Sequence, residues 1–298
     1  MPDTRKAASS PWPTAGATVS GAHAISEKEF AQFQRFIFDA AGITLSSAKK
    51  ALVMSRLARR LQQHQLSSFG EYFRLLSSGE APTETQVAID LLTTNETYFF
   101  RETKHFELLR ELALDARRQA QTMRVWSAAS STGEEAYSIA MVLADCMLEN
   151  TWEVIGSDIS SRVLERARFG HYSLERATHI PLDYLKRFCL KGIGDHQGTL
   201  LIERNLRNRV QFMQINLNAT LPRLGLFDVV FLRNVMIYFN ECTKRQVVDR
   251  ILSSLKPGGY FMVGHSESLH GINDAVQQIA PSIYRQPENS RSLRATRP

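Results

Sequence analysis

Cysteine is scarce in this 298-residue chain, and its three cysteines lie far apart. None of Cys146, Cys189 and Cys242 belongs to a Cys-x-x-Cys pair, which argues against a disulfide framework and against a thiolate zinc cluster. Long apolar runs are also missing. No run approaches the ~18 residues that a membrane span requires, and the N-terminus lacks the apolar core of a signal peptide. We therefore expect a protein of the reducing cytoplasm that is not inserted in a membrane.

Charge is nearly balanced, with 36 Lys+Arg against 30 Asp+Glu and a net charge of +6. So mild an excess leaves nucleic acid, a membrane surface and an acidic protein open as partners. Hydrophobic residues make up 43% and charged residues 22%, a globular balance that excludes a wholly disordered or collagen-like chain. The length predicts about two domains.

The chain divides into a helical part and an α/β part. Residues 1–25 are rich in Ala, Ser, Pro, Thr and Gly, which predicts a disordered tail, and residues 287–298 predict a loose polar end. Residues 26–95 carry apolar side chains at helical spacing and predict an all-helical domain. Over residues 96–286 β-prone runs alternate with helical runs, as in a parallel sheet with helices on both faces. Such sheets bind ligands beyond the carboxyl ends of their strands.

One segment interrupts this alternation. Residues from about 187 to 210 contain Gly192, Gly194 and Gly198 between short β-prone runs. This pattern predicts a small antiparallel sheet inserted into the larger domain.

The loop after the first predicted strand, SAASSTGEEAYS, combines small residues with Gly133 at the start of a helix. Such a loop lets the backbone approach a ligand, and a helix N-terminus favours polar or anionic groups. Glu134 and Glu135 either complement the helix dipole or meet a cationic ligand group. With a single glycine, an ordinary strand–helix turn stays open as an alternative.

Asp158 ends the second predicted strand, where a carboxylate accepts hydrogen bonds from ribose hydroxyls or caps the next helix. Loop and acid together indicate an adenosine-containing cofactor, either NAD or S-adenosylmethionine. S-adenosylmethionine is favoured because the glycines that a pyrophosphate requires are missing. The acidic pair also suits an amino group and a sulfonium better than phosphates.

Polar side chains also surround the fourth predicted strand. Arg233, Asn234 and Tyr238 follow its carboxyl end, where a reacting group would lie, although a single Tyr is often a packing residue. The segment TNETYFFRE precedes the α/β domain and is interpreted as a lid over the cofactor or as an ordinary interdomain helix. The candidate lid residues are Asn95, Thr97 and Arg101.

A predicted helix after Ser46 or Ser47 is strongly basic, with no acid between Leu45 and His64. At helical spacing Lys49, Arg56 and Arg60 share one stripe. The stripe is either a solvated face or a docking surface for an acidic partner. The candidate docking residues are Lys49, Arg56, Arg59 and Arg60.

Taken together, these strings resemble the CheR family of chemotaxis receptor methyltransferases. TNETYFFRE, VWSAASSTGEEAYSIAM, GSDIS, RNVMIYF, LKPGGYF and GHSES occur in that family's order and spacing across roughly residues 26–286. WSAASSTGEEAYS and RNVMIYF are the specific segments, since generic methyltransferases lack them. Ala136 stands where the family commonly has proline, and Ser130 where it commonly has Cys or Ala.

The resemblance implies an all-helical N-terminal domain and a Rossmann-like α/β domain that binds S-adenosylmethionine and carries an inserted antiparallel β-subdomain. It implies methyl transfer to glutamate side chains of chemoreceptor signalling helices in bacterial chemosensory adaptation, giving glutamyl methyl esters and S-adenosylhomocysteine. Arg101 and Tyr238 match the catalytic positions beside the transferred methyl. The cofactor contacts fall on Asn95, Thr97, Arg101, Glu135, Asp158, Asn216, Leu217, Arg233 and Asn234.

This chemistry needs few groups. A carboxylate is already ionised near neutral pH, so it needs no general base, and the enzyme mainly aligns it with the methyl group. No metal is expected, since no His/Cys/Asp cluster with ligand spacing occurs in the sequence.

Two interactions with the receptor are expected. In the first, the acidic helix bundle of the receptor docks on the basic helix. Some family members use a Gly-x-Gly loop in the β-subdomain to hold a receptor C-terminal peptide, and Gly192-Ile193-Gly194 matches it, with a hairpin turn as the alternative. A monomer is expected. A nucleic-acid methyltransferase is disfavoured because no Asn/Asp-Pro-Pro-aromatic string follows the fourth strand, and a cofactor-sensing module because Arg101 and Tyr238 are present.

Overall fold

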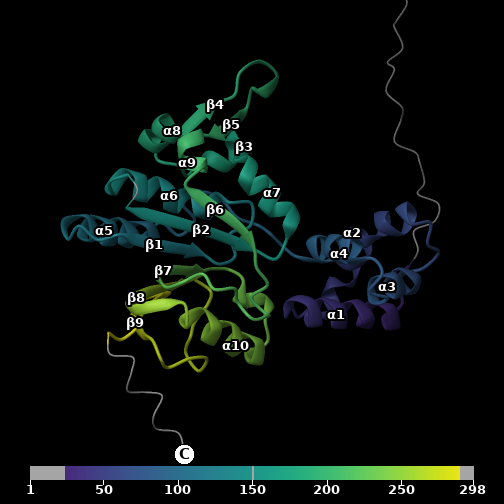
Figure 1. The fold of residues 1–298 in the computed structure, drawn as a ribbon. Helices are drawn as coiled ribbons and strands as arrows, with labels where there is room; N and C mark the ends of the chain where they lie inside the picture. Colours follow the sequence, from purple (N-terminus) through teal and green to yellow (C-terminus); the bar gives the residue numbers. More distant parts are fainter. Residues whose placement is uncertain (1–23, 150, 289–298) are drawn as a thin grey trace, which may run out of the picture.

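The computed structural model describes residues 24–149 and 151–288 (Figure 1). The predicted tails at 1–25 and 287–298 lie almost wholly outside these residues. Ile25 is an exception, because it is buried in the core of the helical domain, so the folded part begins earlier than predicted. No helix in the described ranges is long and apolar enough to cross a membrane.

The helical domain is confirmed and packs around Phe33, Leu57 and Tyr72, all fully buried. Ser26 caps its first helix, accepting a hydrogen bond from the backbone N–H of Glu29 while Glu29 accepts one from that of Ser26. The elements are α1 (Glu27–Ala41), η1 (Ser47–Lys49), α2 (Lys50–Gln63), α3 (Phe69–Ser77) and α4 (Pro82–Leu92).

The larger domain is built on a seven-stranded sheet in the order β6-β2-β1-β7-β8-β10-β9. The first five strands in this order are parallel, as predicted, whereas β10 and β9 extend the sheet with antiparallel pairing. The strands are β1 (Met123–Ser127), β2 (Trp152–Asp158), β6 (Val210–Gln214), β7 (Phe227–Leu232), β8 (Leu255–Val263), β9 (Gln277–Ala280) and β10 (Ile283–Arg285).

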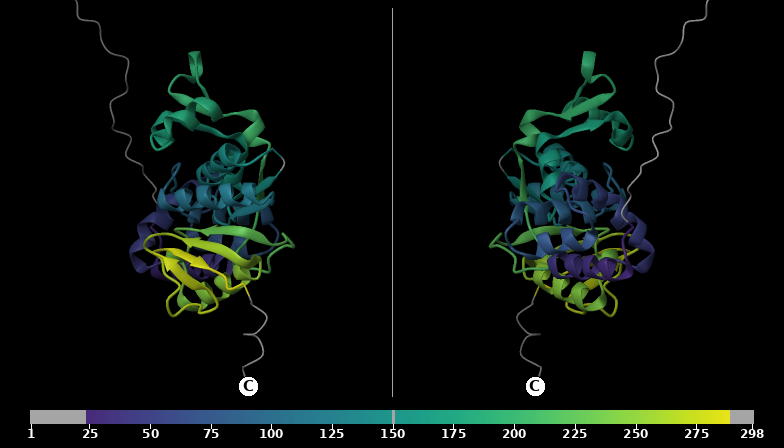
Figure 2. Two further views of the ribbon diagram at one scale, coloured as in Figure 1. Left: turned by 90° about the vertical axis from the view of Figure 1, so that its left-hand side faces the viewer. Right: turned by 90° about the vertical axis from the view of Figure 1, so that its right-hand side faces the viewer.

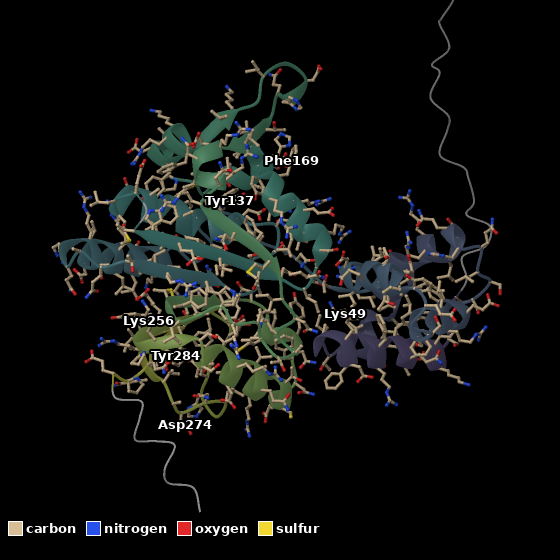
Figure 3. All side chains as sticks on the ribbon, viewed as in Figure 1. Lys49, Tyr137, Phe169, Lys256, Asp274 and Tyr284 are labelled. Atoms are coloured by element: carbon tan, nitrogen blue, oxygen red, sulfur yellow. The ribbon has the colours of Figure 1, made fainter. Side chains whose placement is uncertain are left out.

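Side chains fill both faces of this sheet (Figure 3). Val125 of β1 faces the core that includes helices α5 and α6, whereas its neighbour Trp126 faces the core that includes α10. This alternation places helices on both faces, as the sequence predicted. The helices are α5 (Lys104–Arg118), α6 (Glu134–Cys146), α7 (Ser161–Phe169) and α10 (Glu241–Leu252), with the short η4 (Met236–Tyr238) before α10.

The inserted β-subdomain stands off one end of the molecule (Figure 2). Its three-stranded antiparallel sheet has the order β3-β5-β4. The insertion starts earlier than the predicted residue 187, because β3 lies directly after α7 and is too short for a periodic pattern to reveal. Its elements are β3 (His171–Ser173), η2 (Leu174–Ala177), α8 (Leu182–Phe188), β4 (Cys189–Lys191), η3 (Gly194–His196), β5 (Thr199–Ile202) and α9 (Arg204–Arg207).

The two domains meet along a seam of hydrogen bonds. Asp90 of α4 is buried and its carboxylate accepts hydrogen bonds from the first backbone N–H groups of α7, those of Ser161 and Arg162. Ser160, the N-cap residue of α7, makes no capping bond with its own side chain. A carboxylate from the helical domain therefore caps a helix of the sheet domain.

A second contact joins the chain after α1 to the end of η4. Ile43 forms an antiparallel bridge with Phe239, and the backbone N–H of Thr44 donates to the carbonyl of Tyr238. Gly42 makes this approach possible, because it has a φ of 73° and a Cβ there would lie 2.7 Å from Thr243 Cγ2. The helical domain thus lies against the carboxyl edge of the parallel strands.

Candidate active site

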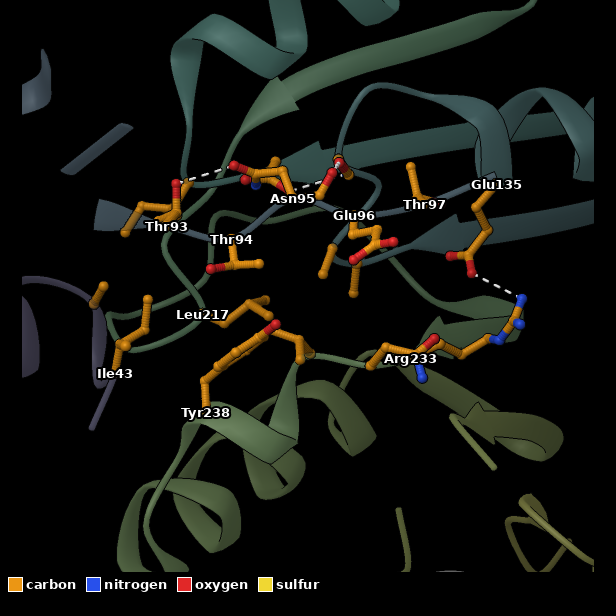
Figure 4. A pocket seen from close by; sticks show the side chains of 18 of the residues that line it. Ile43, Thr93, Thr94, Asn95, Glu96, Thr97, Glu135, Leu217, Arg233 and Tyr238 are labelled. Carbon is orange, nitrogen blue, oxygen red and sulfur yellow. Dashed lines mark hydrogen bonds and ion pairs between the residues drawn. The ribbon is translucent and has the colours of Figure 1, made fainter. Parts of the chain in front are cut away.

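A pocket with about 840 Å³ of space, including its mouth, opens at this edge of the sheet. Its walls come from the helical domain, from the segment between α4 and α5, and from the loops after β1, β2, β6 and β7. Figure 4 shows Tyr238 on one side of the cavity and Asn95, Thr97 and Glu135 on the other. The pocket lies where the topology of a parallel sheet predicts a ligand.

The loop between β1 and α6 forms a tight floor for the pocket. Gly133 has a φ of 96°, and a Cβ there would lie 2.8 Å from the Cβ of Ala167. The Oγ of Ser131 donates to the carbonyl of Asn95, and so joins this floor to the segment between the domains. That segment, residues 93–103, contains no helix, so its interpretation as an interdomain helix is wrong.

Asp158 points its carboxylate at the same loop. It accepts hydrogen bonds from the backbone N–H groups of Ser131, at 3.0 Å, and Ser160, at 2.9 Å. Burial raises the pKa of Asp158 to about 6, although these hydrogen bonds act to lower it. The carboxylate is therefore poised to change its charge just below neutral pH.

A chain of buried charges lies beneath the other end of the pocket. Arg233, with its side chain 1% exposed, donates to Glu135 Oε2 at 3.0 Å and pairs with Glu102 Oε2 at 3.1 Å. Glu135 also accepts a hydrogen bond from the Oγ of Ser127. Burial raises the pKa of Glu135. At Glu102 burial acts in the same direction, but Arg233, the backbone N–H of His265 and the two nearby histidines together outweigh it, and the pKa is lowered. Arg233 is thus occupied by two carboxylates and positions Glu135.

Arg101 and Tyr238 face the pocket and make fewer hydrogen bonds and ion pairs within the protein than Arg233 does. Both are half-buried and line the cavity. Arg101 donates to the carbonyl of Glu96 and lies 5.7 Å from the ring centroid of Tyr98. Its guanidinium has no carboxylate partner among residues 24–149 and 151–288. It is therefore available to a carboxylate that enters the pocket.

The structure brings all ten predicted active-site residues to this one pocket. The sequence did not identify the groups that hold them. Glu267, for example, accepts hydrogen bonds from the backbone N–H groups of Asn234 and Ile237 and so shapes the loop after β7. The predicted residues in the lining are Asn95, Thr97, Arg101, Glu135, Asp158, Asn216, Leu217, Arg233, Asn234 and Tyr238.

The basic helix differs from its prediction. Its own sequence has no acid, but an acid of a neighbouring helix lies against it, since Glu84 of α4 accepts a hydrogen bond from the Nε of Arg60 at 2.7 Å. Arg56 donates to the carbonyl groups of Leu92 and Thr93. Arg56 and Arg60 therefore hold α2 against α4. Lys49 and Arg59 are exposed, and Lys49 is labelled in Figure 3.

Comparisons with known proteins agree with this geometry. The family model described as "CheR methyltransferase, all-alpha domain" matches residues 28–93, and "CheR methyltransferase, SAM binding domain" matches residues 95–284. The chain belongs to the CheR methyltransferase family. As a member of that family it is a methyltransferase, and its cofactor is S-adenosylmethionine.

Curated relatives of this CheR protein are similar over most of their length. The "Chemotaxis protein methyltransferase" of Escherichia coli (strain K12) is 44% identical over 266 residues, which cover 88% of this chain and 91% of the relative. "Chemotaxis protein methyltransferase 2" of Pseudomonas aeruginosa is 40% identical over 260 residues, which cover 86% of this chain and 92% of the relative. Among solved structures, the glycopeptide N-methyltransferase MtfA complexed with sinefungin has 18% identity, 61% and 58% coverage and a TM-score of 0.33, too low to bear on function.

The residues present in this CheR pocket fit the cofactor. Asp158 would hold ribose hydroxyls through its carboxylate, and Glu135 would hold an amino group. Ile159, Ile215 and Leu217 supply an apolar wall for a flat base. Acid and apolar surface therefore occur in one cavity, as an adenosine with a charged tail requires.

Proposed function

We propose that this enzyme methylates glutamate side chains on the signalling helices of chemoreceptors, giving glutamyl methyl esters and S-adenosylhomocysteine for adaptation in chemosensory signalling. The observation that carries the proposal is the presence, in one pocket, of an acid suited to the cofactor, Asp158, and of an arginine, Arg101, that has no carboxylate partner in the described part of the chain. The bound cofactor supplies an electrophilic methyl group.

The chain's own residues align the reaction. Arg101 orients the incoming carboxylate by charge, and the hydroxyl of Tyr238 donates a hydrogen bond to it. No residue has to remove a proton, since a glutamate is ionised near pH 7. The half-buried position of both side chains limits water around the carboxylate, which strengthens the alignment.

The base lability of the product tests this function. The enzyme is incubated with methyl-labelled cofactor and the cytoplasmic part of a host chemoreceptor. We expect the label to be released by alkali as methanol, and to be absent from a receptor whose signalling-helix glutamates are replaced by alanine. A label that survives alkali would overturn ester formation.

We predict that cofactor affinity depends on the charge of Asp158. Below about pH 6 the affinity for S-adenosylhomocysteine should fall about tenfold per pH unit, because a protonated Asp158 is a poorer acceptor for ribose hydroxyls. The effect on folding has the opposite sign. The folded pKa lies above the unfolded value, so this carboxyl favours folding below the unfolded pKa and loses that contribution as pH rises through about 6.

Calorimetric titrations from pH 5 to pH 8 check this dependence. Asp158→Asn serves as the control, because its amide does not titrate, and its affinity should change less across this window than that of the wild type. An identical pH profile in both proteins would remove Asp158 from the cofactor site.

We predict that receptor docking uses the exposed part of the basic surface. Lys49→Glu combined with Arg59→Glu should raise the Michaelis constant for receptor several-fold and leave cofactor affinity unchanged, since exposed charges act within a Debye length of ~8 Å. The matched control is Arg118→Glu, an exposed arginine on α5. Receptor methylation that is equally sensitive to both changes would contradict docking at α2.

Arg56 also borders a hollow that shares Thr93 and Asn95 with the cofactor pocket. Three arginines of the α/β domain line the same hollow: Arg162, Arg166 and Arg176. This positive charge beside the pocket supports the approach of an acidic receptor helix from that side.

We also propose that the β-subdomain holds a receptor C-terminal peptide, and that the chain acts as a monomer. The sequence after Gly192-Ile193-Gly194 also suggests a short strand that could expose an edge, but this strand is β5, which lies between β3 and β4 and exposes none. β4 is an edge strand, and Leu190 on it and Ile193 beyond it are 54% and 81% exposed. An extended peptide can add to such an edge through main-chain hydrogen bonds.

Leu190→Asp and Ile193→Asp should abolish the calorimetric binding of a host receptor C-terminal peptide, because they place charge where apolar side chains of the peptide would pack. Leu182→Asp is the matched control, since Leu182 of α8 is 63% exposed outside the small sheet. Replacing Gly192 is a less informative test of peptide binding, because a Cβ there would lie 1.9 Å from the carbonyl oxygen of His196 and would distort the loop itself. The tether is refuted if no receptor tail binds the wild-type chain at high micromolar concentration.

A further inference from the structure

Three side chains with metal-binding atoms meet beside the cofactor pocket. They are Glu102, just before α5, His105, in its first turn, and His265, after β8, and 163 positions separate the first from the last. One ligand atom from each lies within 4.8 Å of the other two. Glu102 and His105 are three positions apart, and only the fold brings the distant His265 to them.

The hydrogen bonds of His105 determine which ring nitrogen carries the proton. Its Nε2 lies 2.9 Å from the Oγ of Ser282, which itself lies 2.6 Å from the carbonyl oxygen of Pro281. A carbonyl only accepts, so the hydroxyl of Ser282 donates to Pro281 and accepts from Nε2. In the neutral ring Nδ1 therefore carries a lone pair.

This lone pair faces another acceptor. His105 is fully buried, and its Nδ1 has no hydrogen-bond partner within the described part of the chain. Nδ1 lies 3.5 Å from Glu102 Oε2. Both groups are acceptors, so no hydrogen bond joins them, and the cation already beside Glu102 Oε2 is the guanidinium of Arg233, whose Nε donates to it at 3.2 Å.

We propose that His105 Nδ1, Glu102 Oε2 and His265 Nε2 bind a divalent transition-metal ion of the zinc class, with water as a further ligand. Zinc takes nitrogen and carboxylate ligands at ~2.0–2.2 Å in a tetrahedron, which puts neighbouring ligand atoms ~3.4 Å apart. The 3.5 Å between His105 Nδ1 and Glu102 Oε2 agrees with this spacing of ligand atoms. Nε2 of His265 is 3.9 Å from the same oxygen, and its side chain is 57% exposed and free to close the gap.

The surrounding charge permits a dication. Glu102 and Glu135 carry two negative charges around Arg233, which carries one positive charge, so the group is net negative before the metal binds. Two imidazoles and one carboxylate favour zinc, cobalt or nickel over magnesium or calcium, which prefer oxygen ligands. Exposed His265 provides the entry path.

Cobalt(II) and zinc(II) titrations of the whole metal-stripped chain test the site. We expect one saturable site, with a visible cobalt absorption band and a rise in melting temperature with zinc. His265→Ala should weaken cobalt binding at least tenfold, since loss of even an outer partner of a metal ligand costs ~10–100-fold. His265 is exposed, so this variant should fold.

Two further variants make the test specific. His270→Ala changes an exposed histidine five positions away and should bind cobalt as the wild type does. His196→Ala removes one member of the other close histidine pair, since its ring lies 5.7 Å from that of His171. The proposal is overturned if the wild type shows no saturable site, or if His265→Ala retains wild-type affinity. A loss of cobalt binding in His196→Ala, with binding retained in His265→Ala, would overturn it too.

Discussion

Arg233→Ala should lower the free energy of unfolding by about 3–5 kcal/mol, because it leaves Glu102 and Glu135 buried without their shared partner. Denaturant titration followed by circular dichroism measures this loss. Arg233→Lys should recover part of it, since lysine restores the charge but not the fork that reaches both carboxylates.

The same experiment separates two roles of Arg233. If Arg233 only contacted the cofactor, its replacement would lower cofactor affinity and leave the unfolding midpoint unchanged. For Arg233→Ala we expect mainly a loss of stability. Cofactor affinity should fall only indirectly, because Glu135 is displaced. Unaltered stability in Arg233→Ala would contradict the positioning role.

Arg101→Ala should lower the methylation rate about 100-fold at saturating cofactor, because a carboxylate misplaced by ~1 Å can lose that much. Tyr238→Phe should lose about tenfold, the worth of one hydrogen bond. Melting temperatures should change little. Single-turnover assays with receptor and labelled cofactor provide the measurement, and a cofactor titration separates rate from affinity.

A matched pair elsewhere in the fold serves as control. Arg285 lies 5.5 Å from the ring centroid of Tyr260, and neither residue belongs to the pocket lining. Arg285→Ala and Tyr260→Phe should therefore leave turnover unchanged. Comparable losses in both pairs would show that the assay reports general destabilisation rather than roles at the carboxylate.

Much of the site was predictable because parallel sheets bring strand ends together. Glu135 lies in the first turn of α6, Asp158 ends β2 and Tyr238 ends η4, and each reaches the pocket because it lies at or just beyond the carboxyl end of a strand. The resemblance to a family extended this to Asn216 and Leu217, which local chemistry alone did not single out.

The missed features share a different cause, namely contact between elements remote in sequence. A helical stripe shows which side chains share a face, but not that Glu84 of another helix lies against Arg60. Likewise, nothing in the spacing of Glu102, His105 and His265 reveals that the fold joins them. Very short strands such as β3 escaped because three residues show no alternation.

The cap that Asp90 supplies to α7 limits how this protein can be recombined with others. A helical domain taken from an unrelated protein would leave the first N–H groups of α7 without acceptors unless it carried a carboxylate at the same place, because Ser160 makes no cap of its own. It would also need to reach Phe239 in place of Ile43, beside the cofactor pocket. The two domains should therefore be inherited and exchanged as a pair, and a chimaera joined between them should be less stable than either parent.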